Sequence, residues 1–244
     1  MKNSSFVLGL NFGGHDTSAA IMKDGVLVAG CEQERYTRDK HSRKFPKEAV
    51  DDCLHLAGVK MEDISEIAFA FSPQHHVRET YLRPALCDDN RLEFLVNDID
   101  RIKDVLNSEN TIRSTLGFNG KVGFYRHHEC HLASTLYPSG FKDALVVSYD
   151  GIGEIESGIL AVAKKGDLRI FHETTHYPDS LGLLYSAVTA YLGWRHHSDE
   201  GIVMGLACYG DAQEKCELDP KGRSYLEVFN EIIREISDYD YRIN

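Results

Sequence analysis

The sequence lacks any apolar run that approaches the roughly 20 residues of a membrane-spanning helix. Its first residues, MKNSSFVLGLNFGGHD, are polar where a secretory signal would carry its apolar core. It also lacks an excess of basic residues, because 27 Lys and Arg stand against 38 Asp and Glu, a formal net charge of -11. These absences argue against a membrane protein, a secreted protein and a protein that mainly binds nucleic acid. They favour a cytoplasmic enzyme or binding protein.

The six cysteines are scattered along the chain and include no CxxC pair. A disulfide scaffold is typical of small secreted chains, which this sequence does not resemble. We therefore expect reduced thiols, most of them buried as small apolar side chains.

The hydrophobic pattern indicates a mixed α/β protein, and 244 residues suffice for one large domain or two small ones. The Asp24-Gly25 pair is a strong hairpin signal between two predicted strands. A helix opens at Pro46 and stops at Gly58. The predicted strands of this first part are 6–12, 18–23, 26–34, 64–72 and 121–126, and its predicted helices are 46–56, 91–107, 111–116 and 128–137.

The opening pattern returns from residue 144, where strand, glycine-containing turn, strand, Gly-Asp turn and strand follow one another again. A constant offset of 139 residues aligns Asn11 with Asp150 and Ser18 with Ser157. This repeat predicts two ribonuclease-H-like halves with duplicated βββαβα units, as in actin-type (ASKHA) and sugar-kinase-type phosphotransfer proteins. We expect halves at 1–142 and 143–244, the second incomplete. The other elements expected in the second half are helices at 180–193 and 223–236 and a loop or short helix at 200–210.

The function of such folds depends on two glycine-rich turns that face each other across a cleft. Glycine allows backbone N–H groups to approach phosphate oxygens closely. Gly13 and Gly14 lie in the first turn, and Gly151 and Gly153 lie in the second. These four glycines are therefore candidate nucleotide contacts.

The segment RHHECHLAS predicts a metal site. On a helix, His127 and His131 are four residues apart, so both imidazoles lie on one face and form half of a site for a divalent metal. Asp150, at the end of the next predicted strand, would complete a two-histidine, one-carboxylate set that suits Fe(II) or Zn(II). A bare pair of histidines at this spacing is equally compatible with histidines that pack in a core or face solvent.

The first turn also offers His15 at the lip of the expected cleft, and histidine suits general-base work because its pKa lies near neutrality. On spacing alone, Asp16 and Thr17 are as well explained as caps of the turn. The loop ERYTRDKHSRKFP is basic and is able to bind anionic groups, although most such runs are solvated. Its candidate cations are Arg38, Lys40, Arg43 and Lys44.

Six motifs then suggest a family. They occur in the order GLNFGGHDTSAAIMKDG, EQERYTRDKHSRKFP, RHHECHLAS, SYDGIGE, SLGLLYSAVTAYLG and EGIVMGLACYG. Together they resemble the nodulation-type O-carbamoyltransferases, a family that includes enzymes of antibiotic biosynthesis. The resemblance covers nearly the whole chain and thins between residues 72 and 120.

The resemblance implies an ATP-dependent carbamoyltransferase in two steps. A C-terminal YrdC-like domain converts carbamoyl phosphate to carbamoyl adenylate. The N-terminal domain, related to the universal threonylcarbamoyl transferase of tRNA, then moves the carbamoyl group to a hydroxyl of a small molecule or sugar. The resemblance does not identify this acceptor, and the sequence leaves open whether the chain forms a homodimer.

The resemblance also implies roles for single residues. His127, His131 and Asp150 match the ligands of the family's iron, which would hold nucleotide phosphates. His15 matches a histidine near the acceptor hydroxyl, and Lys40 matches a basic residue that stabilises charge on the carbamoyl or phosphate oxygens. The second phosphate turn is matched by Gly151, Gly153 and Glu154.

Three departures from the family pattern affect this interpretation. Where the family commonly reads EGKxMGLAPYG, Ile202 replaces the lysine and Cys208 the proline. The sequence also stops at Asn244, before the remaining metal-binding aspartate and the YrdC-like domain that the family carries. We therefore expect weak metal binding and no transfer activity by this chain alone. The alternatives are an enzyme that carbamoylates tRNA or a maturation protein, and an inactive metal- or nucleotide-binding remnant.

Overall fold

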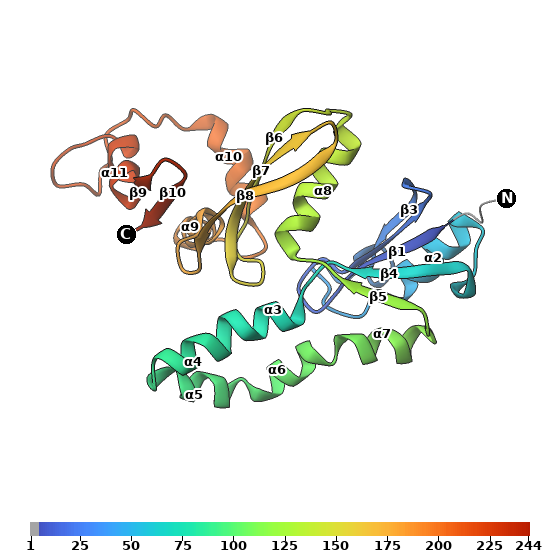
Figure 1. Ribbon diagram of the computed structural model, residues 1–244. Coiled ribbons are helices and arrows are strands. Elements are labelled where there is room, and N and C mark those ends of the chain that lie inside the picture. Colours follow the sequence, from blue (N-terminus) through green and yellow to red (C-terminus); the bar gives the residue numbers. More distant parts are fainter. Residues whose placement is uncertain (1–4) are drawn as a thin grey trace. The chain divides into compact units, whose positions relative to one another are not determined.

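The hairpin signal at Asp24-Gly25 lies at the centre of an antiparallel meander in the computed structural model, which describes residues 5–244 except the side chains of residues 173–176. Both turn residues have positive φ, 49° and 84°, as a tight hairpin of matching twist requires. Two further strands extend the meander to a five-stranded sheet of order β3-β2-β1-β4-β5 (Figure 1). Its strands are β1 (Phe6–Asn11), β2 (Ser18–Lys23), β3 (Val26–Glu32), β4 (Ile64–Phe69) and β5 (Lys121–Phe124).

In this sheet β4 is parallel to β1, and β5 is parallel to β4. A meander of three strands followed by two parallel strands on the side of β1 is the ribonuclease-H-like arrangement. The predicted α/β fold class of the actin type is therefore confirmed. The unit that contains this sheet reaches to Cys130, and a second compact unit covers His131–Asn244.

The core of the first unit lies between the sheet and the helices that cover it. Leu8 and Leu10 of β1 alternate with less buried residues, as expected for a strand with one face in the core. Val50 and Cys53 of α2 are fully buried in the same cluster, as is Ile112 of α7. The short helices and turns of this unit are α1 (Glu34–Thr37), α2 (Lys47–Ala57), η1 (Met61–Asp63), α3 (Pro73–Val77), η2 (Arg78–Leu82), α4 (Arg83–Cys87), α5 (Asn90–Asn97), α6 (Ile99–Leu106) and α7 (Ser108–Leu116).

Helices α3 to α6 form an excursion between β4 and β5, in which α3 and α4 run alongside α6 and α5 (Figure 1). Val77, Tyr81 and Ile102 form a small core of their own there. The Tyr81 hydroxyl donates to Asp98 over 2.8 Å. The single helix expected at 91–107 is two helices, α5 and α6, that meet at Asp98.

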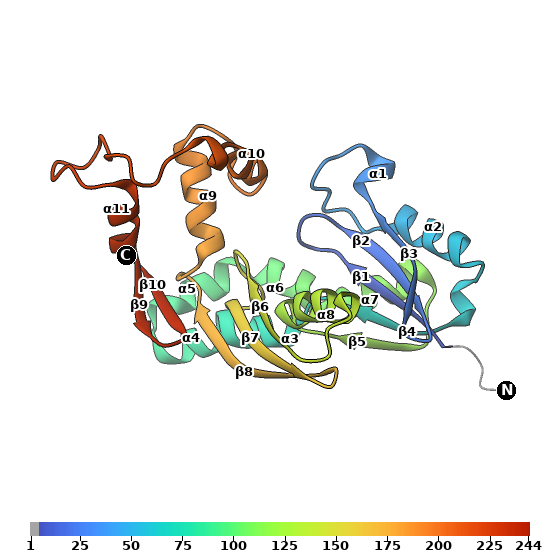
Figure 2. The same ribbon diagram turned by 90° about the horizontal axis from the view of Figure 1, so that it is seen from above.

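The second unit repeats the meander with β6 (Ala144–Tyr149), β7 (Glu156–Lys164) and β8 (Asp167–His176), in the order β6-β7-β8 (Figure 2). Helix α8 (His127–Ser139), within which the division between the units falls, packs Leu132 and Leu136 against this sheet. The helix was expected to stop before Pro138 but continues through it to Ser139. Proline is tolerated there because Gly140, with φ 76°, ends the helix directly afterwards.

The register of the two meanders matches at the offset of 139 residues. Asn11 pairs with Ser18 across β1 and β2, and the N–H of Asp150 donates to the carbonyl of Ser157 over 2.9 Å in the second meander. The next hairpin carries a β-bulge directly after Ile21 in the first unit and directly after Leu160 in the second, which are again 139 residues apart. A shared bulge position is not required by the hydrophobic pattern, so it supports the predicted duplication.

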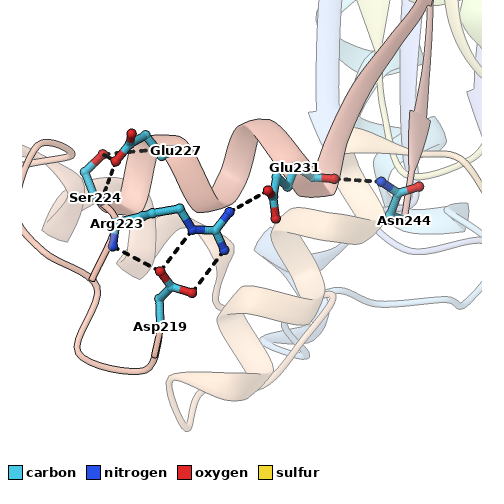
Figure 3. Close-up of polar contacts among 6 residues, drawn as sticks. All are labelled: Asp219, Arg223, Ser224, Glu227, Glu231 and Asn244. Carbon is cyan, nitrogen blue, oxygen red and sulfur yellow. Dashed lines mark hydrogen bonds and ion pairs between the residues drawn. The ribbon is translucent and has the colours of Figure 1, made fainter. Parts of the chain in front are cut away.

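The last part of the chain contains α9 (Leu181–Tyr191), α10 (Glu200–Leu206), η3 (Ala207–Tyr209), α11 (Tyr225–Ile232) and a hairpin of β9 (Ile233–Ser237) and β10 (Asp240–Ile243). The prediction of one helix over 223–236 is wrong after Ile232. Short apolar runs fit both periods, and here pairing with β10 stabilises the extended conformation. Arg223, at the start of α11, binds Asp219 and Glu231 (Figure 3).

The cysteines are less buried than expected. Cys53 and Cys216 are buried, Cys31 and Cys130 are half-buried, and Cys87 and Cys208 are exposed. All six are free thiols in this structure. Within the described residues, no helix combines the length and the apolar character that crossing a bilayer requires.

Candidate metal centre

Helix α8 and the end of β6 bring the three predicted metal ligands together. His127 and His131 lie one turn apart on α8, and Asp150 follows the last residue of β6. One ligand atom from each of the three residues lies within 4.8 Å of the other two. The Nε2 of His131 is 3.3 Å from Oδ2 of Asp150. His128, between the two histidines, is fully buried, which agrees with its expected place on another face of the helix.

These distances fit one divalent cation. A cation bound at about 2.0–2.2 Å holds neighbouring ligand atoms roughly 3.0–3.5 Å apart in tetrahedral or octahedral geometry. The contact between His131 and Asp150 lies within that range. Two imidazoles and a carboxylate suit Fe(II) or Zn(II), and the His131 and Asp150 side chains are 48% and 43% exposed, which leaves room for water or phosphate oxygens.

Asp150 is held in place by three contacts besides the histidine. The N–H of Gly151 donates to its Oδ1 over 2.6 Å, and the hydroxyl of Ser180 donates to its backbone carbonyl over 2.9 Å. Its own N–H bonds to Ser157 in the meander. Oδ1 is thus engaged within the turn while Oδ2 faces His131, an arrangement that orients a carboxylate ligand.

The second glycine turn is closed by internal hydrogen bonds. The N–H of Gly153 donates to the carbonyl of Glu156 over 2.8 Å, and the N–H of Gly151 binds Asp150. The side chain of Glu154 is fully buried. In this structure the N–H groups of these glycines shape the turn and orient Asp150.

One glycine that the sequence analysis missed is required by this turn. A Cβ on Gly182, in the first turn of α9, would lie 2.5 Å from the N atom of Gly151 and 2.6 Å from the carbonyl carbon of Asp150. Only glycine allows the helix to approach the turn this closely. No local pattern marks Gly182, because it sits in an ordinary helical segment.

The first glycine turn presents an exposed backbone. Gly13 has a φ of 89°, and a Cβ at Gly13 or Gly14 would meet no atom within 4 Å. The side chain of Asn11 closes the turn by donating to the carbonyl of Asp16 over 3.2 Å. The alternative of a Thr17 side-chain cap is not what the structure shows, because the buried Thr17 hydroxyl makes no hydrogen bond.

Asp16 links His15 to the basic loop. Its Oδ2 lies 2.7 Å from Nδ1 of His15, and its Oδ1 lies 2.9 Å from Nδ1 of His41. Partial burial by itself raises the pKa of Asp16, but the hydrogen bonds and charges of His15 and His41 outweigh it and hold this pKa below its ordinary value. His41 was not among the predicted site residues, and its only local signal is its place beside Lys40.

The basic loop lies against the first turn through its backbone. The N–H of Thr17 donates to the carbonyl of Ser42 over 3.3 Å. Lys40 is exposed, as are Arg38, Arg43 and Lys44, and the Lys44 ammonium lies 3.9 Å from Asp39. The structure thus places the Lys40 loop beside the turn that carries His15.

Comparison with known proteins places this geometry in a family. Residues 7–225 match the family described as carbamoyltransferase N-terminus. The nodulation protein NolNO of Sinorhizobium fredii is 35% identical over 204 residues, covering 81% of this chain and 28% of that protein. An uncharacterized Synechocystis protein, sll1178, is 35% identical over 216 residues, 84% of this chain and 35% of that protein. The chain therefore spans about a third of the length of the curated relatives it matches.

Solved structures resemble the chain more distantly. Component A of the (R)-2-hydroxyglutaryl-CoA dehydratase of Acidaminococcus fermentans aligns with a TM-score of 0.41 and 13% identity, over 87% of this chain and 62% of that chain. The ROK hexokinase of Thermus thermophilus aligns with a TM-score of 0.38 and 14% identity, over 84% of this chain and 70% of that chain. The sequence matches confirm the predicted resemblance to nodulation-type proteins, and the chain belongs to the carbamoyltransferase N-terminus family.

Proposed function

We propose that this chain serves an ATP-dependent O-carbamoyltransferase, in which carbamoyl phosphate supplies the group, carbamoyl adenylate carries it, and a hydroxyl of a small molecule or sugar accepts it. The observation that supports this most directly is the convergence of His127, His131 and Asp150 beside a glycine turn. A metal centre at this place suits the binding of nucleotide phosphates. Family membership makes carbamoyl transfer the reaction of choice.

In this proposal His127, His131 and Asp150 hold a divalent cation, with Fe(II) the preferred ion. The cation, when bound, offsets negative charge on phosphate oxygens. The two imidazoles bind as neutral rings and Asp150 as a carboxylate, states that all three residues reach near pH 7. Gly151 and Gly153 give the second turn its shape, and the Gly151 N–H keeps one Asp150 oxygen turned away from the ligand position.

The first turn and its neighbouring loop act on the acceptor and the transferred group. Gly13 and Gly14 leave backbone accessible to phosphate or carbamoyl oxygens. Nδ1 of His15 faces the carboxylate of Asp16, so Nε2 is the atom that accepts the proton of the acceptor hydroxyl. The ammonium of Lys40 stabilises negative charge on the carbamoyl or phosphate oxygens. These roles assign residues 1–142 and 143–244 to the two halves of one phosphate-binding domain.

An anaerobic Fe(II) titration tests the metal centre. We expect His131→Ala to bind Fe(II) at least about tenfold more weakly than the parent chain, because it removes one of three ligands. His196→Ala is the matched control, since His196 is an exposed histidine of the same unit outside the ligand set, and its affinity should equal that of the parent. Equal affinity in parent and His131→Ala would contradict the proposal.

The same titration tests the nucleotide. If ATP phosphates share the cation with the three residues, ATP must raise the Fe(II) affinity of the parent, and Fe(II) must raise the ATP affinity by the same factor. In His131→Ala both effects should shrink together. ATP binding that is indifferent to Fe(II) in the parent would contradict the assignment of nucleotide phosphates to this centre.

A further inference from the structure

The carboxylate of Asp16 receives an imidazole on each of its two oxygens. His15 approaches Oδ2 and His41 approaches Oδ1, with separations of 2.7 and 2.9 Å. A single carboxylate held from both sides cannot rotate without breaking one of the two hydrogen bonds. The position of the His15 ring is therefore coupled to a residue of the basic loop that lies 25 positions away in the sequence.

The donor roles in this pair follow from chemistry. An ionised carboxylate only accepts hydrogen bonds, and the low pKa of Asp16 keeps it ionised. Both histidines must then carry a proton on Nδ1. For neutral His15 this leaves the lone pair on Nε2, on a side chain that is 65% exposed. A carboxylate that selects the tautomer of a catalytic histidine in this way is a recurrent device.

His41 is fixed by its surroundings more firmly than His15. Its side chain is 26% exposed, and its buried Nε2 makes no hydrogen bond. A buried, unsatisfied N–H on a charged ring costs more than an unsatisfied lone pair on a neutral one, which favours neutral His41 with its proton on Nδ1. Its backbone N–H donates to the carboxylate of Glu34 over 3.1 Å.

The backbone supports the same arrangement. Asp16 and His41 both have a φ of 55°, in the left-handed region that residues other than glycine rarely adopt. The hydrogen bond from Thr17 to Ser42 joins the residues that follow each of them. Two positions in this conformation, joined by adjacent backbone and side-chain bonds, indicate a built contact between turn and loop.

We propose that His41 is a positioning residue for His15, acting through Asp16. His41 holds the Asp16 carboxylate, which in turn keeps the His15 proton on Nδ1 and turns Nε2 towards the acceptor hydroxyl. In the transfer step, the hydroxyl proton passes to Nε2 and the hydroxyl oxygen bonds to the carbamoyl carbon. The bond from that carbon to the adenylate oxygen breaks, and its electron pair leaves with the phosphate. This inference rests on the proposed role of His15 as base.

The tautomer of His15 gives a direct test on the 244-residue chain. Long-range ¹H–¹⁵N NMR of histidine-labelled protein, at a pH where the imidazoles are neutral, distinguishes a protonated Nδ1 from a protonated Nε2. His15→Gln identifies the His15 signals by their loss. In the parent we expect the Nδ1–H tautomer of His15 to predominate, against the Nε2–H preference of free imidazole side chains in water.

Two substitutions at position 41 separate positioning from folding. Both His41→Asn and His41→Gly tolerate the left-handed backbone, but only Asn retains a side-chain N–H that can reach Asp16. We expect His41→Asn to keep the Nδ1–H tautomer of His15 and His41→Gly to return it towards the Nε2–H form. His55→Gln, on the exposed side of α2, should leave it unchanged.

An unchanged His15 tautomer in a folded His41→Gly variant would overturn the proposal, as would an Nε2–H tautomer in the parent. A return towards Nε2–H in His41→Gly, with retention in His41→Asn, would support it. These signals do not depend on metal, nucleotide or turnover. Failure of the Fe(II) and ATP titrations would therefore count against the proposed function and not against the positioning role.

Discussion

The hydroxyl of Ser180 donates to the backbone carbonyl of Asp150 over 2.9 Å and accepts the N–H of Leu183 over 3.1 Å. One side chain thus caps the N-terminus of α9 and holds the residue that completes the candidate metal centre. Ser180 is 1% exposed, so water cannot replace either contact. The start of α9 and the ligand position of Asp150 are therefore mechanically joined.

Replacing this serine should affect stability and metal binding together. Ser180→Ala removes an N-cap and leaves a buried carbonyl without its donor, and we expect a loss of about 1–2 kcal/mol in the free energy of unfolding. Urea denaturation measures this loss, and Fe(II) titration should show weaker binding. Ser224→Ala removes the N-cap of α11, which has no contact with Asp150. It should cost stability alone, and a loss of Fe(II) affinity there would contradict the coupling.

Gly182 gives a sharper steric test. Gly182→Ala would force a Cβ to 2.5 Å from the N atom of Gly151, and backbone cannot yield as a flexible side chain does. We expect destabilisation of about 1–3 kcal/mol, despite the better helix propensity of alanine. Gly205→Ala in α10 meets no atom within 4 Å and should stabilise by up to about 1 kcal/mol. Similar unfolding midpoints for the two variants would show that α9 does not approach the turn this closely.

Asp150→Asn separates the charge of the ligand from its place in the fold. The amide oxygen can still accept the N–H of Gly151, so we expect little change in the melting temperature. Loss of the carboxylate charge should weaken Fe(II) binding by about tenfold or more. An unchanged Fe(II) affinity, measured by the same anaerobic titration, would place the cation elsewhere.

The pH dependence of stability should report the pair of Asp219 and Arg223 (Figure 3). Side-chain hydrogen bonds from the Arg223 guanidinium, each 3.0 Å, hold the pKa of Asp219 well below its ordinary value. The stabilisation is then complete above the unfolded aspartate pKa of about 3.9, and declines as the pH falls below it towards the folded pKa. Asp219→Asn should lower the melting temperature by a few degrees, about 2–6 °C, at pH 7.

This difference should narrow as the pH is lowered from about 5 to about 3, because the parent then gains the proton that the variant never binds. Asp100→Asn is the control, since Asp100 is 91% exposed and its contact with Lys103 is a surface pair. Its melting temperature should follow the parent at every pH. A difference for Asp219→Asn that stays constant or widens in acid would reject the assigned pKa shift.

Much of the fold was predictable because it depends on local pattern. The hairpin at Asp24-Gly25 requires positive φ at both residues, which these residue types tolerate, and the alternation in β1 requires only one buried face. The two meanders share these features at a constant offset. By contrast, the segment after Ile232 carries apolar residues that fit either period, and pairing with β10 decides between them.

The roles assigned to His15 and Lys40 and the halves at 1–142 and 143–244 remain predictions. What the structure adds at the first turn is a contact that no spacing indicates. Asp16 and His41 belong to different segments, and only the backbone bond between Thr17 and Ser42 brings those segments together.

The sequence by itself determined that His127 and His131 share a face, because the period of a helix places residues four apart in line. Their meeting with Asp150 was decided by tertiary structure, since packing of α8 against β6 and β7 sets the distance between helix and strand end. The same holds for Gly182, whose missing Cβ matters only because the turn of Asp150 lies against it. Local periodicity fixes which side chains point together, and long-range packing fixes what they reach.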